Sequence, residues 1–274
     1  MKIKIRHLLL GLLGGLALLG QAWAEPVYSF SVAPQFERRV LFGIWQPVLA
    51  ELQQRTGQRF ELVTSLSVND YDQDVRRGRY DFIYINPYLM LDAARSPGYL
   101  PLVRDERPLH GILVVRQDSP VEKVEELQGK TLAVPALSAM GASLLLRAEL
   151  ERKFGLRLRP VIAKTHSSVF LHVVNGFTDA GGSVQKALSE QDPLVRSALR
   201  VLYRTSDVAS HPVAVHRRVP AEVREQVRQA FIAMSADPAG RALLARIPMQ
   251  EAVAARLEDY QVMEELHLER YLQE

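Results

Sequence analysis

The sequence predicts an α/β fold made of two successive series of alternating strands and helices. Short apolar runs typical of strands alternate with segments whose apolar residues recur at helical spacing. Gly, Pro or Asn marks most boundaries, and neither an internal repeat nor a Gly/Ser linker interrupts the 274 residues. This order predicts mainly parallel sheets covered by helices, and the length allows one large domain or two of ordinary size.

The first series begins after the N-terminal segment. Val27–Val32 alternates as a strand does, and Pro34 follows it. Apolar residues at helical spacing from Val40 to Thr56 predict a helix that ends at Gly57. Similar boundary residues delimit a strand at Arg59–Thr64, a short helix at Asn69–Arg77, a buried strand at Tyr80–Ile85 and a helix from Pro87.

The second series repeats this alternation and is followed by C-terminal helices. Its expected strands are His110–Arg116, Thr131–Val134, Leu158–Ile162, Arg200–Tyr203 and Val213–His216, with a further strand-to-helix transition at Asp179–Gly182. Its expected helices are Val121–Leu127, Ser138–Phe154 with Ser138 as the cap, Ser167–Asn175, Ala221–Met234 and Pro238–Ala245. We therefore expect two series joined by short crossovers inside one compact unit.

The N-terminus has the three parts of a secretory signal peptide. Lys2, Lys4 and Arg6 precede an apolar run over residues 8–20, and residues 21–24 end in the A-x-A pattern of a cleavage site. The run is shorter than the about 20 apolar residues of a membrane span. We expect residues 1–24 to be a signal peptide and the mature protein to begin at Glu25 in the periplasm. The chain has no Cys, so it is not expected to be a lipoprotein.

The charge balance argues against nucleic acid as a partner. The whole chain has 34 basic and 31 acidic residues, and Lys2, Lys4 and Arg6 of the N-terminal segment account for the difference. The rest therefore has a formal charge of zero, without the excess of basic residues that binding to nucleic acid or an anionic membrane selects. We expect a monomer that binds no nucleic acid.

The sequence contains none of the common catalytic motifs. It has no Cys and no G-x-G-x-x-G, P-loop, G-x-S-x-G or H-E-x-x-H pattern. His172 lies within a predicted helix, and the five-residue spacing of His211 and His216 suits a shared metal poorly. We therefore expect no catalytic residue, no metal and no cofactor, with a Ser–His–Asp hydrolase as a disfavoured alternative.

Polar or small residues follow the expected strands at five places. These places are Ala33–Gln35, Asn86–Tyr88, Ser138–Gly141, Thr165–Ser168 and Gly181–Ser183. In open α/β sheets, ligands bind beyond the carboxyl ends of the strands, and the N–H groups at a helix start favour an anion. Asn86, Ser138 and Thr165 are also good helix caps, so a capping role alone stays an alternative for each of them.

Several segments, in order along the chain, resemble one family of transport receptors. Asp118–Val121 and Glu126–Val134 resemble the hinge-proximal signature of type II periplasmic binding proteins. The segments Gly78–Asp81, Ile83–Tyr88, Thr165–Ser168, Asn175–Gly181 and His211–Pro212 resemble the phosphate/phosphite/phosphonate-binding receptors of ABC transporters. The resemblance covers nearly the whole mature chain.

The resemblance implies a two-lobed architecture. Each lobe would be a mainly parallel sheet flanked by helices, and crossover strands near Arg116 and Ser206 would form the hinge. Lobe one would comprise residues 25–116 and 207–274, and lobe two residues 117–206. A ligand would bind in the cleft between the lobes, and closure would present both lobes to a membrane permease.

The resemblance also implies a ligand site in this cleft. Ser138 and Gly141 fit the loop that supplies hydroxyls and amides to phosphonate oxygens, and Tyr88 fits an aromatic position. His166 fits a histidine of the next loop, where Ser167 would add a hydroxyl and a helix-start amide. The candidate ligand-binding residues are Tyr88, Asn86, Ser138, Gly141, His166, Ser167, Ser183 and His211.

Three positions depart from the family pattern. Ala139 and Met140 stand where the family has hydroxyl residues, and His211 stands where it often has an acidic or amide residue. Two missing donors would each cost on the order of 1–3 kcal/mol if ligand groups stayed unpaired. Met140 would also make the cleft more apolar, and an amine on the ligand would lose its partner at His211. We expect a small anionic ligand, a phosphonate or phosphite first, that is delivered to an ABC permease.

Other functions stay open at this point. The same fold serves as an extracytoplasmic sensor that passes its closed state to a partner such as a sensor kinase. A receptor for a different organic anion would use the same cleft. An enzyme on this architecture is disfavoured because no nucleophile–base pair is evident.

Overall fold

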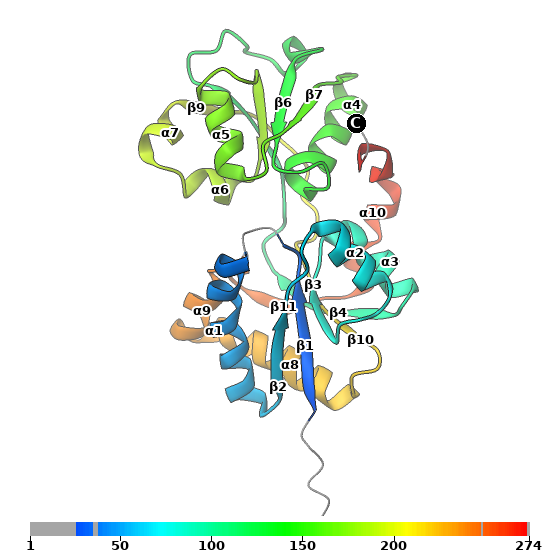
Figure 1. Cartoon of the computed structure of the whole chain (residues 1–274). Coiled ribbons are helices and arrows are strands. Elements are labelled where there is room, and N and C mark those ends of the chain that lie inside the picture. Colours follow the sequence, from blue (N-terminus) through cyan, green and yellow to red (C-terminus); the bar gives the residue numbers. More distant parts are fainter. Residues whose placement is uncertain (1–25, 35–37, 248, 273–274) are drawn as a thin grey trace, which may run out of the picture.

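Two separate β-sheets, each flanked by helices, form the two lobes of the molecule (Figure 1). The structure is a computed structural model, and it describes residues 26–34, 38–247 and 249–272. The two-lobed α/β architecture is confirmed. The expected signal peptide, residues 1–24, lies outside the described residues.

The first lobe contains a mixed sheet with the strand order β11-β4-β10-β3-β1-β2. Its strands are β1 (Val27–Val32), β2 (Arg59–Val63), β3 (Phe82–Tyr84), β4 (Tyr99–Asp105), β10 (Val213–His216) and β11 (Ala252–Ala254). β1 pairs in parallel with β2 and β3, whereas β10 and β11 pair antiparallel with their neighbours. The expectation of a mainly parallel sheet therefore holds for one half only, because β10 returns from the other lobe and enters the sheet in the opposite direction.

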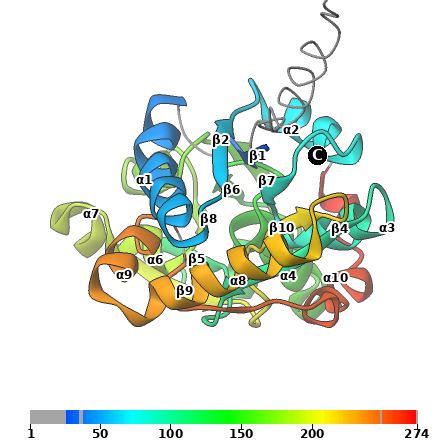
Figure 2. The same cartoon turned by 90° about the horizontal axis from the view of Figure 1, so that it is seen from below.

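Helices cover both faces of this sheet. One face is covered by α1 (Arg38–Thr56), α8 (Ala221–Ala236) and α9 (Pro238–Leu244). The other is covered by α2 (Val68–Arg76), η1 (Pro87–Leu89), α3 (Met90–Arg95), η4 (Leu257–Tyr260), α10 (Val262–Glu265) and η5 (Leu268–Leu272). The view from below shows α1 and α9 toward one side of the molecule and α3 and α10 toward the other (Figure 2). Alternation along β3 explains this, because Phe82 and Tyr84 belong to the first apolar cluster and Ile83 belongs to the second.

The second lobe contains a sheet with the order β7-β6-β8-β5-β9. Its strands are β5 (Ile112–Arg116), β6 (Thr131–Val134), β7 (Arg159–Ile162), β8 (Ala180–Ser183) and β9 (Leu199–Arg204). Parallel pairing joins β7, β6 and β8, and β5 is antiparallel to both of its neighbours. The flanking helices are η2 (Val124–Leu127), η3 (Met140–Leu145) and α4 (Leu146–Phe154) on one face, and α5 (His166–Val174), α6 (Gln185–Ser189) and α7 (Pro193–Ser197) on the other.

Two antiparallel segments connect the lobes, one between β4 and β5 and the other between β9 and β10. Leu109 and Val208 exchange backbone hydrogen bonds of 2.8 and 2.9 Å. The Gly111 amide donates to Thr205 Oγ1 at 2.8 Å. The expected crossover near Ser206 agrees with this geometry, but the one near Arg116 is wrong, because β5 pairs with β8 and β9 and thus belongs to the second sheet. By sheet membership, the first lobe ends before Ile112.

The helix after β6 differs from the expected one. Ala139, not Ser138, precedes the first helical residue, and no side chain caps this end. The first turn is π-helical, and the amides of Ser143 and Leu144 both donate to the Ala139 carbonyl, at 2.9 and 3.0 Å. Ser138 as a helix cap is therefore wrong.

Candidate functional site

Three parallel strands of the second sheet end at the edge that faces the first lobe, and each leads into a helix. β6 leads to η3, β7 to α5 and β8 to α6. Gly182 of β8 lies against η3, since a Cβ there would overlap the carbonyl oxygen of Ala142. A Cβ on Gly181 would lie 2.8 Å from side-chain atoms of both Val169 and Val173 of α5. Glycine at these two positions therefore lets η3 and α5 pack closely on either side of the β8 end.

The starts of these two helices carry backbone amides without acceptors. At α5, the Thr165 hydroxyl caps the Ser168 amide at 3.1 Å, and the amides of His166 and Ser167 have no acceptor among the described residues. At η3, the amides of residues 140–142 likewise have no acceptor within the described chain, although these three residues are buried. The first amides of a helix have no acceptor within that helix, and their partial positive charge favours an anionic acceptor.

His166 and Ser183 form a pair beside these amides. His166 Nδ1 and Ser183 Oγ are 2.8 Å apart. Ser183 is fully buried, with 0% of its surface exposed, and His166 is partly exposed. Ser183 is therefore paired with His166 in this structure, and its expected contact with a ligand stays a prediction.

The first lobe contributes Asn86 and His211 from adjacent strand ends. The Asn86 side chain caps η1 by accepting from the Tyr88 amide at 3.0 Å, and its Nδ2 donates to the Ser138 carbonyl at 2.8 Å. This second bond links the two lobes. His211 stacks on Tyr84, with ring centroids 5.6 Å apart. Asn86 thus caps a helix and bridges the lobes at the same time.

Burial keeps both site histidines neutral. It lowers the pKa of His166 to about 4 and that of His211 to about 4, and no charged neighbour contributes to either shift. A neutral imidazole can donate one hydrogen bond and accept another.

Tyr88 and Met140 both pack in the second apolar cluster, which residues of both lobes form. Tyr88 lies partly buried against this cluster, and its expected contact with a ligand stays a prediction. Burial and then Glu269 of η5 raise the pKa of its hydroxyl, which places the ring toward the C-terminal segment. Met140 is 2% exposed and belongs to the same cluster. Its side chain is therefore buried where the two lobes meet, and its effect on the cleft stays a prediction.

A family model decides the identity of the chain. The model described as ABC transporter, phosphonate, periplasmic substrate-binding protein matches residues 30–260. The chain belongs to this family. Members of this family are periplasmic substrate-binding proteins of phosphonate ABC transporters.

Solved structures share the fold of this receptor. PhnD1 of Prochlorococcus marinus in complex with methylphosphonate has a TM-score of 0.78 at 11% identity, over 90% of this chain and 99% of that one. A protein of Xanthomonas citri bound to ATP has a TM-score of 0.74 at 19% identity, over 89% and 98%. A binding protein component of a phosphonate ABC transporter from Pseudomonas aeruginosa has a TM-score of 0.73 at 16% identity, over 90% and 88%. At these identities the likeness shows the fold alone.

Two further contacts join the lobes of the receptor, and the sequence did not predict them. Lys186 of α6 donates to the Ala245 carbonyl, which follows α9, at 2.9 Å. On the other side, the C-terminal segment rises from the first lobe to α4, where the Tyr271 hydroxyl donates to Glu151 at 2.8 Å (Figure 1). No local pattern marks either contact, because each one depends on how the lobes sit together.

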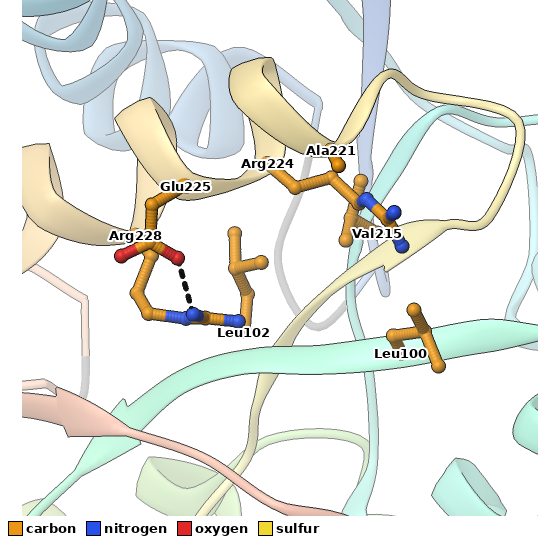
Figure 3. Close-up of a pocket in the computed structure, with 7 residues that line it drawn as sticks. All are labelled: Leu100, Leu102, Val215, Ala221, Arg224, Glu225 and Arg228. Carbon is orange, nitrogen blue, oxygen red and sulfur yellow. Dashed lines mark hydrogen bonds and ion pairs between the residues drawn. The ribbon is translucent and has the colours of Figure 1, made fainter.

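Two cavities formed by described residues of the receptor lie away from the predicted site. One, of about 270 Å³, lies between α8 and the first sheet, where Leu100, Leu102 and Val215 face Arg224 and Arg228 (Figure 3). The other, of about 500 Å³, lies between α4, β7 and η5. None of the eight candidate residues lines either cavity.

The described part of this receptor shows neither a metal-binding cluster of side chains nor a membrane-spanning helix. Within residues 26–34, 38–247 and 249–272, no group of three or more acidic or His side chains is placed to hold a metal ion. No helix in that part of the chain is both long and apolar enough to cross a bilayer.

Proposed function

We propose that this receptor captures a small oxyanion, a phosphonate or phosphite first, between its lobes and delivers it to an ABC permease. The observation that carries the proposal is the set of backbone amides without acceptors at the starts of η3 and α5. Both starts follow neighbouring strands of one sheet, and the partial positive charge of a helix start favours an anion. Removal of residues 1–24 in the periplasm is part of the same proposal.

Backbone donors explain how the site tolerates its departures from the family pattern. Ala139 and Met140 provide no hydroxyls, but the amides of residues 140–142 do not depend on side-chain identity. A hydrogen bond to a charged group contributes about 1.5–3 kcal/mol, so a few such amides compensate for two lost hydroxyls. The replacement of two hydroxyl residues is therefore compatible with an oxyanion ligand.

The contact between the lobes favours a small ligand. Asn86 Nδ2 lies 2.8 Å from the Ser138 carbonyl, so the two loops touch directly. The Xanthomonas relative binds ATP and the Prochlorococcus relative binds methylphosphonate. Because the loops touch, we favour a ligand of the size of methylphosphonate over a nucleotide.

Calorimetry on the protein from Glu25 onward tests the ligand class. Phosphite, methylphosphonate, phosphate, methylsulfonate, acetate and ATP serve as probes. At about 100 times its dissociation constant, a bound ligand adds close to 3 kcal/mol to the free energy of unfolding, so a thermal shift gives a second readout. Binding of methylphosphonate or phosphite supports the proposal. Binding of acetate, methylsulfonate or phosphate alone overturns the choice of a phosphonate or phosphite, and binding of ATP alone or of no probe overturns a small oxyanion.

A pair of variants tests the amides themselves. His166→Ala and His166→Pro both remove the imidazole, but only His166→Pro removes the amide N–H. Thr165 has an extended backbone (φ −133°, ψ 157°), so a proline fits at the first helical position. We expect His166→Pro to bind methylphosphonate about ten-fold more weakly than His166→Ala. Equal affinities contradict the role of this amide.

Delivery to a permease needs its own test. A deletion strain that loses uptake of the ligand, and regains it with the wild-type gene, supports transport. Normal uptake combined with a lost transcriptional response to the ligand supports the sensor alternative instead.

A further inference from the structure

The hydrogen bond between Ser183 and His166 leaves one ring nitrogen free for a ligand. Ser183 Oγ and His166 Nδ1 are 2.8 Å apart, and no other hydrogen bond reaches either atom in the described structure. His166 Nε2 has no partner there either, and it is not among the fully buried unpartnered atoms, so it is accessible to solvent. It lies on the residue whose own amide also lacks an acceptor.

The burial of Ser183 decides which nitrogen carries the proton. A neutral imidazole has one donor nitrogen and one acceptor nitrogen. If Nδ1 donated to Ser183, the hydroxyl proton would be left unpaired in a site with 0% exposure. If the hydroxyl donates to Nδ1, both groups are satisfied and Nε2 carries the proton. The second arrangement is therefore favoured.

We propose that Ser183 is a positioning residue that holds neutral His166 in the tautomer with the proton on Nε2, so that the ring donates to the bound oxyanion. The ligand part of this inference rests on the proposed function, whereas the tautomer does not. Burial supports it by keeping the ring neutral, since the pKa of His166 is lowered to about 4 without any contribution from a charged neighbour.

Nitrogen-15 NMR of histidine-labelled protein tests the tautomer without any ligand. The His166 signals are assigned by their loss in His166→Gln. We expect a single neutral form protonated on Nε2 in the wild type, and a mixture with the Nδ1-protonated form in Ser183→Ala. A wild-type ring protonated on Nδ1, or identical spectra in the two proteins, overturns the proposal even if the protein binds an anion.

The affinity for methylphosphonate tests whether the His166 ring, held in this tautomer, donates to the ligand. We expect Ser183→Ala to bind about three- to ten-fold more weakly than the wild type. The matched control is Ser143→Ala, because Ser143 is also fully buried but its hydroxyl has no partner; its affinity should equal that of the wild type. Equal loss in the two variants, or no loss in Ser183→Ala, overturns the proposal.

Substitutions of His166 itself provide a third readout. The amide nitrogen of Gln can take the position of Nε2, whereas that of Asn takes the position of Nδ1. We expect His166→Gln to retain more affinity than His166→Asn, and the reverse order contradicts a donor at Nε2. If the wild type binds no oxyanion at all, the proposed function fails, and the NMR comparison still decides the tautomer.

Discussion

At the scale of single residues, the two site histidines link stability to pH. Both pKa values are lowered to about 4 in the folded protein, against about 6.5 in an unfolded chain. The unfolded state therefore binds more protons between these values, and the free energy of unfolding falls as the pH decreases from about 6.5 toward 4. For each histidine we expect a slope of up to roughly 1.4 kcal/mol per pH unit, measured by urea unfolding.

In the double variant His166→Gln/His211→Gln, the free energy of unfolding should lose most of this dependence on pH. The control is His267→Asn, because the His267 side chain is 73% exposed and Asn tolerates its φ of 41°. An unchanged slope in the double variant would show that other groups govern the acid sensitivity.

A second single-residue prediction concerns Glu149, which fastens the second crossover segment to α4. Glu149 is 5% exposed and accepts from the Ser206 amide at 3.0 Å, the Ser206 hydroxyl, and the Tyr203 hydroxyl at 2.6 Å. We expect Glu149→Gln to lower the free energy of unfolding at pH 7 by about 3 kcal/mol, because the amide cannot satisfy these donors. Glu190→Gln is the control, since that side chain is 61% exposed.

The pH dependence of this contact follows from the same geometry. Burial raises the pKa of Glu149, but hydrogen bonds from Ser206, Tyr203 and Lys153 outweigh it, and the pKa lies below its usual range. The stabilisation is therefore present above the pKa of the unfolded chain and is lost as the pH falls through the folded value. A Glu149→Gln effect that persists undiminished at pH 3 would contradict a charged acceptor.

At the scale of elements, one prediction concerns Met140 at the start of η3. Met140 is buried in the second apolar cluster, which residues of both lobes form. We expect Met140→Ser to lower the free energy of unfolding by about 2–5 kcal/mol without strengthening methylphosphonate binding. Met140→Leu is the control and should cost less than about 1.5 kcal/mol. Tighter binding by Met140→Ser would show that residue 140 faces the ligand.

Periodicity predicted the long elements of this fold, and it failed where pairing partners decide. α1 and α8 begin within about two residues of their expected limits, because apolar residues at helical spacing mark them directly. β4 contains Pro101 and Arg104 and was not predicted, and the three residues of β11 are strand only because they pair with β4. The sheet to which β5 belongs could not be read from local sequence for the same reason.

The sequence likewise predicted one part of the candidate site and missed another. The loops after β6, β7 and β8 were expected from strand ends and do lie at one edge. The pairing of Ser183 with His166 and the bridge from Asn86 to Ser138 depend on packing between elements, and no spacing in the sequence marks them.

At the scale of the whole molecule, the two edges of the contact between the lobes differ. Beside α4, the C-terminal segment makes several contacts: Arg147 donates to the Tyr271 carbonyl at 2.8 Å, and Arg270 pairs with Glu151 at 2.5 Å. The second apolar cluster also contains buried residues of both lobes on this side. At the opposite edge, the hydrogen bond from Lys186 to the Ala245 carbonyl joins α6 to the end of α9.

This asymmetry predicts the direction in which the receptor opens. Separating apolar side chains of the cluster costs about 25 cal/mol per Å² exposed, whereas one exposed hydrogen bond contributes about 0.5–1.5 kcal/mol. We therefore expect α6 to move away from α9 in the ligand-free protein while α4 stays against the C-terminal segment. The chain has no Cys, so pairs of spin labels can be introduced without background substitutions.

Double electron–electron resonance measures the distances within two pairs of spin labels and tests this direction of opening. The first pair, at Glu190 and Ala242, spans the edge with the Lys186 hydrogen bond, and the second, at Glu125 and Glu265, spans the C-terminal side; all four residues are exposed. We expect methylphosphonate to shorten and narrow the distance distribution of the first pair and to leave the second unchanged. In the ligand-free protein, Lys186→Met should shift the distance distribution of the first pair further toward long distances. Equal movement of both pairs would mean that the C-terminal segment releases α4 during opening, and movement of the second pair alone would place the hinge at the opposite edge.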